Sequence, residues 1–129
     1  METLNKSSHH TIKIGTDCCF LFAYCALIAW LSSRSISTVS LNYFPHQDKL
    51  IHFGAYFVMC VFTWRCFRHF ISNRNSLMIS SILFCSFYGI TDEIHQSFTP
   101  NRVMDIYDWV ADSVGALIAG IGLFKLNKQ

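Results

Sequence analysis

The sequence predicts an all-α protein, an integral membrane bundle of four transmembrane helices. Only 14% of the 129 residues are charged, 52% are hydrophobic and 16% are aromatic, whereas about a quarter of an ordinary soluble domain is charged. Four apolar runs alternate with short polar segments, and each run is near the lower limit of about 17 residues for a spanning helix. A chain of this length corresponds to one domain, so we expect residues 1–129 to form a single membrane domain.

The first spanning helix is predicted over residues 17–33. Its apolar core, CCFLFAYCALIAWL, is uncharged and is followed by Arg34. The segment before it, residues 1–16, is polar and mildly basic, and we expect a solvated tail there. A run of about 14 residues also fits the core of a signal peptide. The following SSRSIS lacks a small-x-small cleavage site, which favours a retained helix.

The other three helices are predicted over residues 48–67, 77–96 and 107–126. Proline is tolerated in the first turn of a helix, so Pro45 indicates that the second helix begins around residues 44–48. A basic turn, residues 68–74, separates the second helix from the third. Pro100–Asn101 is a turn signal before the fourth helix.

Small residues in the fourth helix predict close helix packing. They recur at spacings of four, at Ala111 and Gly115 and again at Ala116 and Gly120. Such spacings let two helices approach closely in lipid. Gly54–Ala55 and Gly89 are the expected partners on the neighbouring helices.

Four spans place both termini on one side of the membrane, and positive charge predicts that this side is the cytoplasm. With an inside N-terminus, seven lysines and arginines lie inside and three lie outside, as the positive-inside rule requires. The inside set is Lys6, Lys13, Arg65, Arg68, Arg74, Lys125 and Lys128, and the outside set is Arg34, Lys49 and Arg102. We therefore expect a multi-pass protein of the cytoplasmic (inner) membrane.

Acidic residues gather in one stretch, Thr91 to Asp112, between the third and fourth apolar runs. This stretch holds five of the eight acids, namely Asp92, Glu93, Asp105, Asp108 and Asp112. A charged side chain at the bilayer centre costs about 2.5–3.5 kcal/mol on insertion scales. An acid such as Asp112, which lies inside its predicted helix, is therefore a functional hypothesis by default.

The candidate site residues come from the outer ends of three helices. Those expected to be catalytic are His52, Glu93, Asp108 and Asp112, and those expected to bind substrate are Asp48, Lys49, Gln96 and Arg102. His52 or Glu93 suits the role of general base, and a guanidinium reads phosphate through paired hydrogen bonds. Asp108 and Asp112 would orient the histidine or bind a metal.

Each of these assignments has a structural alternative. His52 also fits a core histidine hydrogen-bonded to a neighbour, and Glu93 fits a solvated interfacial acid. Asp105, Asp108 and Asp112 share one helix face at spacings of three and four, where Arg102, Lys49, His52 or a metal would offset their repulsion. Oxygen-rich sites of this kind hold Mg²⁺, Mn²⁺ or Ca²⁺. No cofactor motif is evident, so a divalent metal is the candidate cofactor.

The composition also bounds the partners. A net charge of +2 is too small to suggest nucleic acid, so membrane lipids are the expected partners and protein partners stay open. The six cysteines all lie within or at the ends of apolar runs. None has the spacing of a metal site, and we expect them to be small buried hydrophobes.

Three motifs in order resemble the VanZ-like family of small membrane proteins. They are DKLIH, then EIHQ, then RVMDIYDWVAD followed by GALIAG, and together they cover residues 48–120. The resemblance implies a four-helix membrane core with polar positions at Asp48, Lys49, His52, Glu93, Gln96, Arg102 and Asp108. Asp112 departs from the family's pattern, because many members have asparagine there.

The resemblance also implies a class of function. The family takes its name from a protein linked to teicoplanin resistance, a glycopeptide resistance, and has been grouped with membrane proteins that process lipid head groups. It implies a polar site at the extracytoplasmic face that processes phosphate-containing lipid or envelope-precursor head groups. An enzyme would be a lipid head-group phosphodiesterase or transferase. The alternative is a non-catalytic membrane protein that binds a lipid or an envelope partner. A channel is less well supported, because the inner halves of the spans are apolar.

Overall fold

The computed structural model describes residues 2–34 and 46–127, and within them the chain forms four helices and no strand. The helices are α1 (Glu2–Ser32), α2 (Gln47–Phe67), α3 (Arg74–Ser97) and α4 (Ile106–Leu126). Each contains a segment long and apolar enough to cross a membrane. The predicted all-α bundle is confirmed, and the protein has the character of a multi-pass membrane protein.

The ends of the helices follow the sequence closely except at the start of α1. That helix begins at Glu2 rather than near residue 17, so the expected solvated tail belongs to the helix. The tail contains no proline, and extending an existing helix costs far less than starting one. α3 begins three residues before its predicted start, where the Asn73 side chain accepts a hydrogen bond from Ser76 N at 3.0 Å. The predicted start of α2 at residues 44–45 lies outside the described residues.

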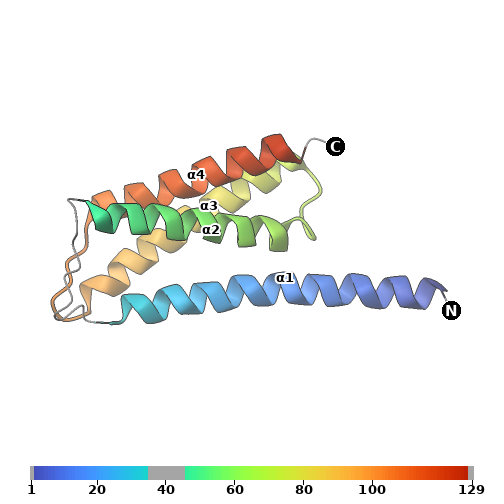
Figure 1. The fold of residues 1–129 in the computed structure, drawn as a ribbon, viewed down its shortest axis with the longest axis horizontal. Coiled ribbons are helices and arrows are strands. Elements are labelled where there is room, and N and C mark those ends of the chain that lie inside the picture. The colour runs from blue at the N-terminus through green and yellow to red at the C-terminus, as the bar shows by residue number, and fades with distance from the viewer. Residues whose placement is uncertain (1, 35–45, 128–129) are drawn as a thin grey trace.

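α2, α3 and α4 pack together, and α1 lies along one side of them (Figure 1). The start of α1 and the end of α4 lie at the same end of the bundle, as an even number of spans requires. The start of α2, the end of α3 and the start of α4 meet at the opposite end. Three helix ends from distant parts of the sequence therefore converge there.

Close contact between helices depends on glycines in α4. A Cβ placed on Gly115 would collide with the carbonyl oxygen of Phe53 in α2. One placed on Gly120 would lie 2.7 Å from Ile82 in α3. The predicted close packing of the small residues is present, with Gly115 against the backbone beside Gly54.

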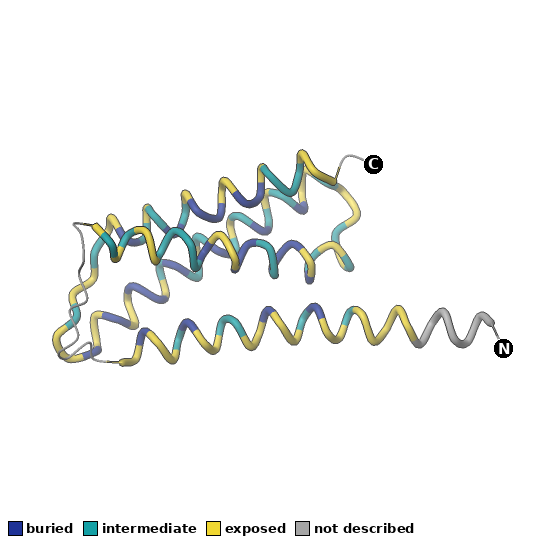
Figure 2. Tube along the Cα trace, viewed as in Figure 1, coloured by how far each residue is buried: buried dark blue, intermediate teal, exposed yellow. Residues whose placement is uncertain are grey.

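The bundle has a small apolar core and an apolar outer surface. Ile28, Tyr56, Met59, Cys60, Cys85, Ala116 and Ala119 form the core. Buried positions line the inner faces of the helices, and exposed positions cover the outside (Figure 2). The outside includes large apolar side chains such as Phe22, 73% exposed, and Phe87, 64% exposed. In a membrane these side chains face lipid, where apolar exposure has no cost.

Polar contacts attach α1 to the rest of the bundle. Tyr24 donates a hydrogen bond to the Ala55 carbonyl at 3.0 Å, and Tyr88 donates one to the Cys25 carbonyl at 2.7 Å. A hydrogen bond in lipid has no competing water, so such bonds help to hold helices in register.

Candidate functional site

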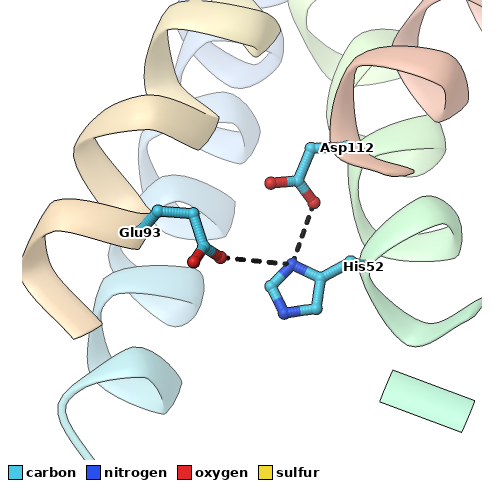
Figure 3. Close-up of side chains that lie close together, drawn as sticks. All are labelled: His52, Glu93 and Asp112. Atoms are coloured by element: carbon cyan, nitrogen blue, oxygen red, sulfur yellow. Dashed lines mark hydrogen bonds and ion pairs between the residues drawn. The ribbon is translucent and has the colours of Figure 1, made fainter. Parts of the chain in front are cut away.

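Three side chains from three helices meet at the converging helix ends (Figure 3). His52 comes from α2, Glu93 from α3 and Asp112 from α4, and we call them the His52 centre. His52 Nδ1 lies 2.9 Å from Asp112 Oδ1 and 3.9 Å from Glu93 Oε1. Both carboxylates are completely buried. An isolated charge in such a place is unfavourable unless a partner or a bound cation offsets it.

The His52 centre has hydrogen-bonding capacity that the described residues do not use. Glu93 Oε2 accepts a hydrogen bond from the Asp105 backbone N–H at 3.0 Å. Glu93 Oε1 and Asp112 Oδ2 are buried and have no hydrogen-bond partner among the described residues. Buried polar atoms are nearly always paired in folded proteins, so two unpaired carboxylate oxygens in one place point to a ligand.

A second group, the Lys49 network, lies beside the centre and consists of Lys49, Asp48, Asp105 and Asp108. Lys49 Nζ lies 3.1 Å from Asp48, 2.8 Å from Asp105 and 2.9 Å from Asp108. An ammonium group has three protons to donate, and each of them has a carboxylate here. Lys49 was expected to bind substrate, but a phosphate could reach it only by displacing one of these carboxylates.

The Lys49 network also adjusts the charge and position of its neighbours. The ammonium of Lys49 lowers the pKa of Asp105 below its usual range, and a hydrogen bond from the Tyr107 backbone N–H adds to this effect. Asp105 is the N-cap of α4 and not part of the helix. Asp108 Oδ2 lies 3.9 Å from His52 Nε2, so Asp108 connects the network to the His52 centre.

Local sequence explains how Asp108 and Asp112 reach the centre. They are four residues apart in α4 and therefore share a helix face, which the structure turns towards His52. Gly89 of α3 lies directly opposite, where an added Cβ would be 3.0 Å from Asp112 Oδ2. The absence of a side chain at Gly89 leaves the space that Asp112 occupies.

The Gln96 side chain pairs with Asp92 and not with Glu93. Its side-chain amide donates to Asp92 Oδ2 at 3.1 Å and lies 3.4 Å from Ser32 Oγ. Ser32 donates to the other oxygen of Asp92. Asp92 and Gln96 are four residues apart in α3 and therefore lie on one helix face, whereas no sequence pattern places Ser32, at the end of α1, beside them.

A cavity of about 130 Å³ joins this polar group to the His52 centre. Its lining comes from α1, α2, α3 and the loop before α4, and comprises Ile28, Leu31, Ser32, Ile51, His52, Ala55, Tyr56, Asp92, Gln96 and Arg102. Leu31 is 50% exposed and Ile51 62% exposed, so apolar residues open to the surroundings form part of the wall. The Tyr56 hydroxyl is buried with no partner among the described residues.

The cavity contains a free cation. Within residues 2–34 and 46–127, the Arg102 guanidinium has no carboxylate within ion-pair distance, while Lys49 and Arg65 each have one or more. Arg102 follows Asn101, whose φ of 64° forms the predicted turn, and asparagine tolerates this conformation better than most residues. The turn brings the guanidinium to the cavity that His52 also lines.

All eight predicted site residues therefore lie at one end of the bundle. His52, Glu93, Asp108 and Asp112 are in or beside the His52 centre, Asp48 and Lys49 are in the Lys49 network, and Gln96 and Arg102 line the cavity. The predicted site residues did not include Ser32, Asp92 or Tyr56, and the structure places all three in the lining of the cavity. Tyr56, four residues after His52, lies on the same helix face, and this spacing was the available signal.

A further cluster lies at the other end of the bundle and was not predicted. Asp17 of α1 is 2% exposed and accepts hydrogen bonds from Arg65 at 2.7 and 3.0 Å. His69 Nε2 lies 2.8 Å from the other Asp17 oxygen. These contacts join α1 to the end of α2 and the turn after it.

Comparison with known proteins places the chain in a family. The family model described as VanZ/LLP1 matches residues 6–128, nearly the whole chain. A curated relative, "Uncharacterized protein C11E3.10" of Schizosaccharomyces pombe, is 29% identical over 75 residues, which are 58% of this chain. The match covers only 45% of the length of that protein. No solved structure matches the chain. The match of the family model along nearly the whole chain shows that the protein belongs to the VanZ/LLP1 family.

Proposed function

We propose that this protein is a membrane enzyme that hydrolyses or exchanges the head group of a phosphate-containing lipid or envelope precursor. The observation that carries the proposal is the cavity shared by Arg102 and His52. It combines a buried acid–base centre and apolar walls with a guanidinium that has no ion-pair partner among the described residues.

The cavity suits an amphipathic substrate that enters from the membrane. Leu31 and Ile51 are apolar, exposed and part of the cavity wall, so they offer a surface to an acyl chain. Arg102 offers paired hydrogen-bond donors to a phosphate. A phospholipid carries both features at the boundary between its chains and its head group, and this match supports a lipid over a soluble phosphoester.

The residues divide into binding and reacting groups. Arg102 holds the phosphate, and Gln96, fixed by Asp92, lines the same cavity. The His52 centre supplies the groups that accept a proton from the attacking water or hydroxyl. The Lys49 network keeps Asp108 beside the imidazole. Lys49 acts in this proposal by positioning, because its three donors are already in use.

The proposal places the site at the extracytoplasmic face. Seven positive residues would then lie on the inside with both termini, in agreement with the positive-inside rule. Reporter fusions after Ser40, Asn73 and Asn101 test this arrangement. We expect extracytoplasmic signals from the first and third fusions and a cytoplasmic signal from the second. A cytoplasmic signal at Asn101 would overturn the orientation.

Turnover of defined lipids tests the enzymatic role. The purified protein is placed in vesicles containing anionic and zwitterionic phospholipids, and released or exchanged head groups are measured by mass spectrometry. Loss of a general base typically costs 10²–10⁴-fold in rate, so we expect losses of that order for His52→Ala and Glu93→Gln.

His95→Ala is a matched control. His95 is in α3 near the same end, and its ring nitrogen Nε2 lies 3.2 Å from the Ser33 hydroxyl and not in the His52 centre, so this variant should keep the wild-type rate. Arg102→Lys should raise KM more than it lowers kcat, because lysine keeps the charge but loses the paired donors. Equal rates in the wild type, His52→Ala and Glu93→Gln would reject the site assignment.

A non-catalytic lipid-binding protein is the competing function. It is favoured by the fact that both acids of the His52 centre are completely buried, as in a structural network. That function predicts lipid binding without turnover in the wild type. It also predicts that Glu93→Gln, which keeps the shape of the side chain, retains function in cells.

A further inference from the structure

We propose that the His52 centre is a binding site for one divalent transition-metal ion, held by His52 Nδ1, one oxygen of Glu93 and one oxygen of Asp112. No assignment of this ion comes from the family match.

The donor atoms already have a separation close to that of metal ligands. The three ligand atoms lie within 4.8 Å of one another, and His52 Nδ1 is 2.9 Å from Asp112 Oδ1 and 3.9 Å from Glu93 Oε1. Atoms about 2.0–2.2 Å from a zinc ion lie about 3.3–3.6 Å apart in a tetrahedral arrangement. Small side-chain rotations would therefore give a suitable set. Figure 3 shows the three groups directed towards a common point.

The unpaired atoms provide the second, independent observation. Glu93 and Asp112 are both completely buried, and one oxygen of each lacks any hydrogen-bond partner in the described part of the chain. An unsatisfied buried polar group destabilises a folded protein, and more so when it is charged. A cation between the two carboxylates would satisfy both atoms at once.

The balance of charge leads to the same conclusion. Carboxylates outnumber cations in the His52 centre and the Lys49 network together, since Lys49 alone is shared among Asp48, Asp105 and Asp108. Glu93 and Asp112 are left with His52 as their neutralising partner. One divalent ion would balance these two carboxylates and allow the imidazole to be neutral.

The donor set also indicates the class of ion. One imidazole nitrogen and two carboxylate oxygens suit Zn²⁺, Mn²⁺ or Fe²⁺, whereas Mg²⁺ and Ca²⁺ prefer oxygen ligands alone. A metal-bound histidine usually donates its other N–H to a carboxylate. Asp108 Oδ2 lies 3.9 Å from His52 Nε2 and would accept that hydrogen bond after a small movement of its side chain, so we assign it as a positioning residue.

The role of the ion rests on the proposed function. Three protein ligands leave at least one position for water, as in catalytic metal sites, and a bound ion makes that water a nucleophile near neutral pH. In hydrolysis the water oxygen would form a bond to phosphorus while the bond from phosphorus to the departing alcohol oxygen breaks. One proton of the water would pass to the oxygen of Asp112 that does not bind the ion and from there to bulk water, and the departing alcohol would take up a proton from bulk water in exchange. With the ion bound, His52 is a ligand, and the carboxylate is the base.

Metal binding can be measured without any substrate. The full chain is stripped with a chelator, placed in lipid nanodiscs and titrated with Mn²⁺, and free Mn²⁺ is followed by electron paramagnetic resonance. We expect one ion per chain, and at least tenfold weaker binding in each of His52→Ala, Glu93→Gln and Asp112→Asn. Zn²⁺ should compete for the same site.

Asp92→Asn is the matched control, because Asp92 is a buried acid next to Glu93 but pairs with Ser32 and Gln96. The Mn²⁺ affinity of Asp92→Asn should stay within about twofold of the wild type. The three ligand variants should instead lose at least tenfold in affinity, as changes at metal sites typically do. Circular dichroism before titration confirms that each variant is folded. Absence of a bound ion in the folded wild type would overturn the proposal, as would equal affinity in Glu93→Gln and Asp92→Asn. Turnover without metal would reject the role of the ion alone, and an ion without turnover would reject the proposed function alone.

Discussion

Replacing Gly115 by alanine should separate α2 from α4 and destabilise the bundle. A Cβ at this position would collide with the Phe53 carbonyl oxygen and lie 3.1 and 3.2 Å from two other Phe53 backbone atoms. The obstructing atoms belong to a helix backbone, so they cannot rotate away as a side chain can. Overpacking of this kind costs about 1–3 kcal/mol.

The intrinsic helix preference of alanine partly conceals this cost, and Gly122→Ala removes that ambiguity. Replacing glycine by alanine inside a helix returns about 1 kcal/mol. Gly122 is in the same helix, and a Cβ there would meet nothing within 4 Å. The difference in stability between Gly115→Ala and Gly122→Ala therefore isolates the steric term of about 1–3 kcal/mol.

The stability of both variants can be measured by unfolding the purified proteins in mixed detergent micelles and monitoring the loss of helix by circular dichroism. Gly115→Ala should unfold at a lower denaturant concentration than the wild type, and Gly122→Ala at an equal or higher one. Phe53 is next to His52, and Gly115 is three residues after Asp112, so the same separation should also weaken the His52 centre. If the two variants proved equally stable, the close approach of α2 and α4 at Gly115 would be refuted.

Three further predictions concern the polar clusters. Lys49 lowers the pKa of Asp105, so their interaction stabilises the fold above the ordinary carboxyl pKa of about 4 and is lost as the pH falls through the lowered pKa. Lys49→Met should therefore be less stable than the wild type at pH 7 and equally stable near pH 2. A difference in stability that does not change with pH would contradict this. Asp17→Asn should destabilise the protein by about 2 kcal/mol, which is less than the loss for a fully buried ion pair because Arg65 is half exposed and can turn to water. The double variant Asp17→Asn/Arg65→Gln should regain part of the lost stability. An unchanged unfolding midpoint in Asp17→Asn would show that the cluster does not stabilise the protein. Gly89→Ala should displace Asp112, which lies 3.0 Å from the position of the added Cβ, and weaken Mn²⁺ binding, whereas an unchanged affinity would show that Asp112 can move freely.

Sequence reasoning predicted most of the fold because membranes leave a chain few options. Only helices satisfy their backbone hydrogen bonds within one segment, so four apolar runs meant four helices. The ends of α2 and α4 fell within one residue of the prediction, because charged or turn-forming residues flank those runs. The start of α1 was predicted about 15 residues too late. The polar segment before the apolar run carries no signal that interrupts a helix, so the helix extends through it.

The site was predicted as a set of residues, while its internal pairing was not. Successive spans run in opposite directions, so the start of α2, the end of α3 and the start of α4 had to lie at one end of the bundle, which brought together His52, Glu93 and Asp112. The choice of Asp92 over Glu93 by Gln96 depends on the rotation of α3, which no spacing along the chain specifies. The saturation of Lys49 by three carboxylates likewise depends on how α2 faces the loop before α4.

The sequence by itself determined the membrane character, the number of helices and the end of the bundle where polar residues collect, because these follow from hydrophobicity and charge along one dimension. Among the residues that the structure describes, the tertiary structure decided that the buried Glu93 and Asp112 each keep one unpaired oxygen near His52, and that Arg102 has no ion-pair partner beside the cavity. It also decided that Asp17 pairs with Arg65 and His69. The physical reason is that helix rotation and packing distance depend on contacts between distant residues, such as Gly115 against Phe53 and Asp112 over Gly89.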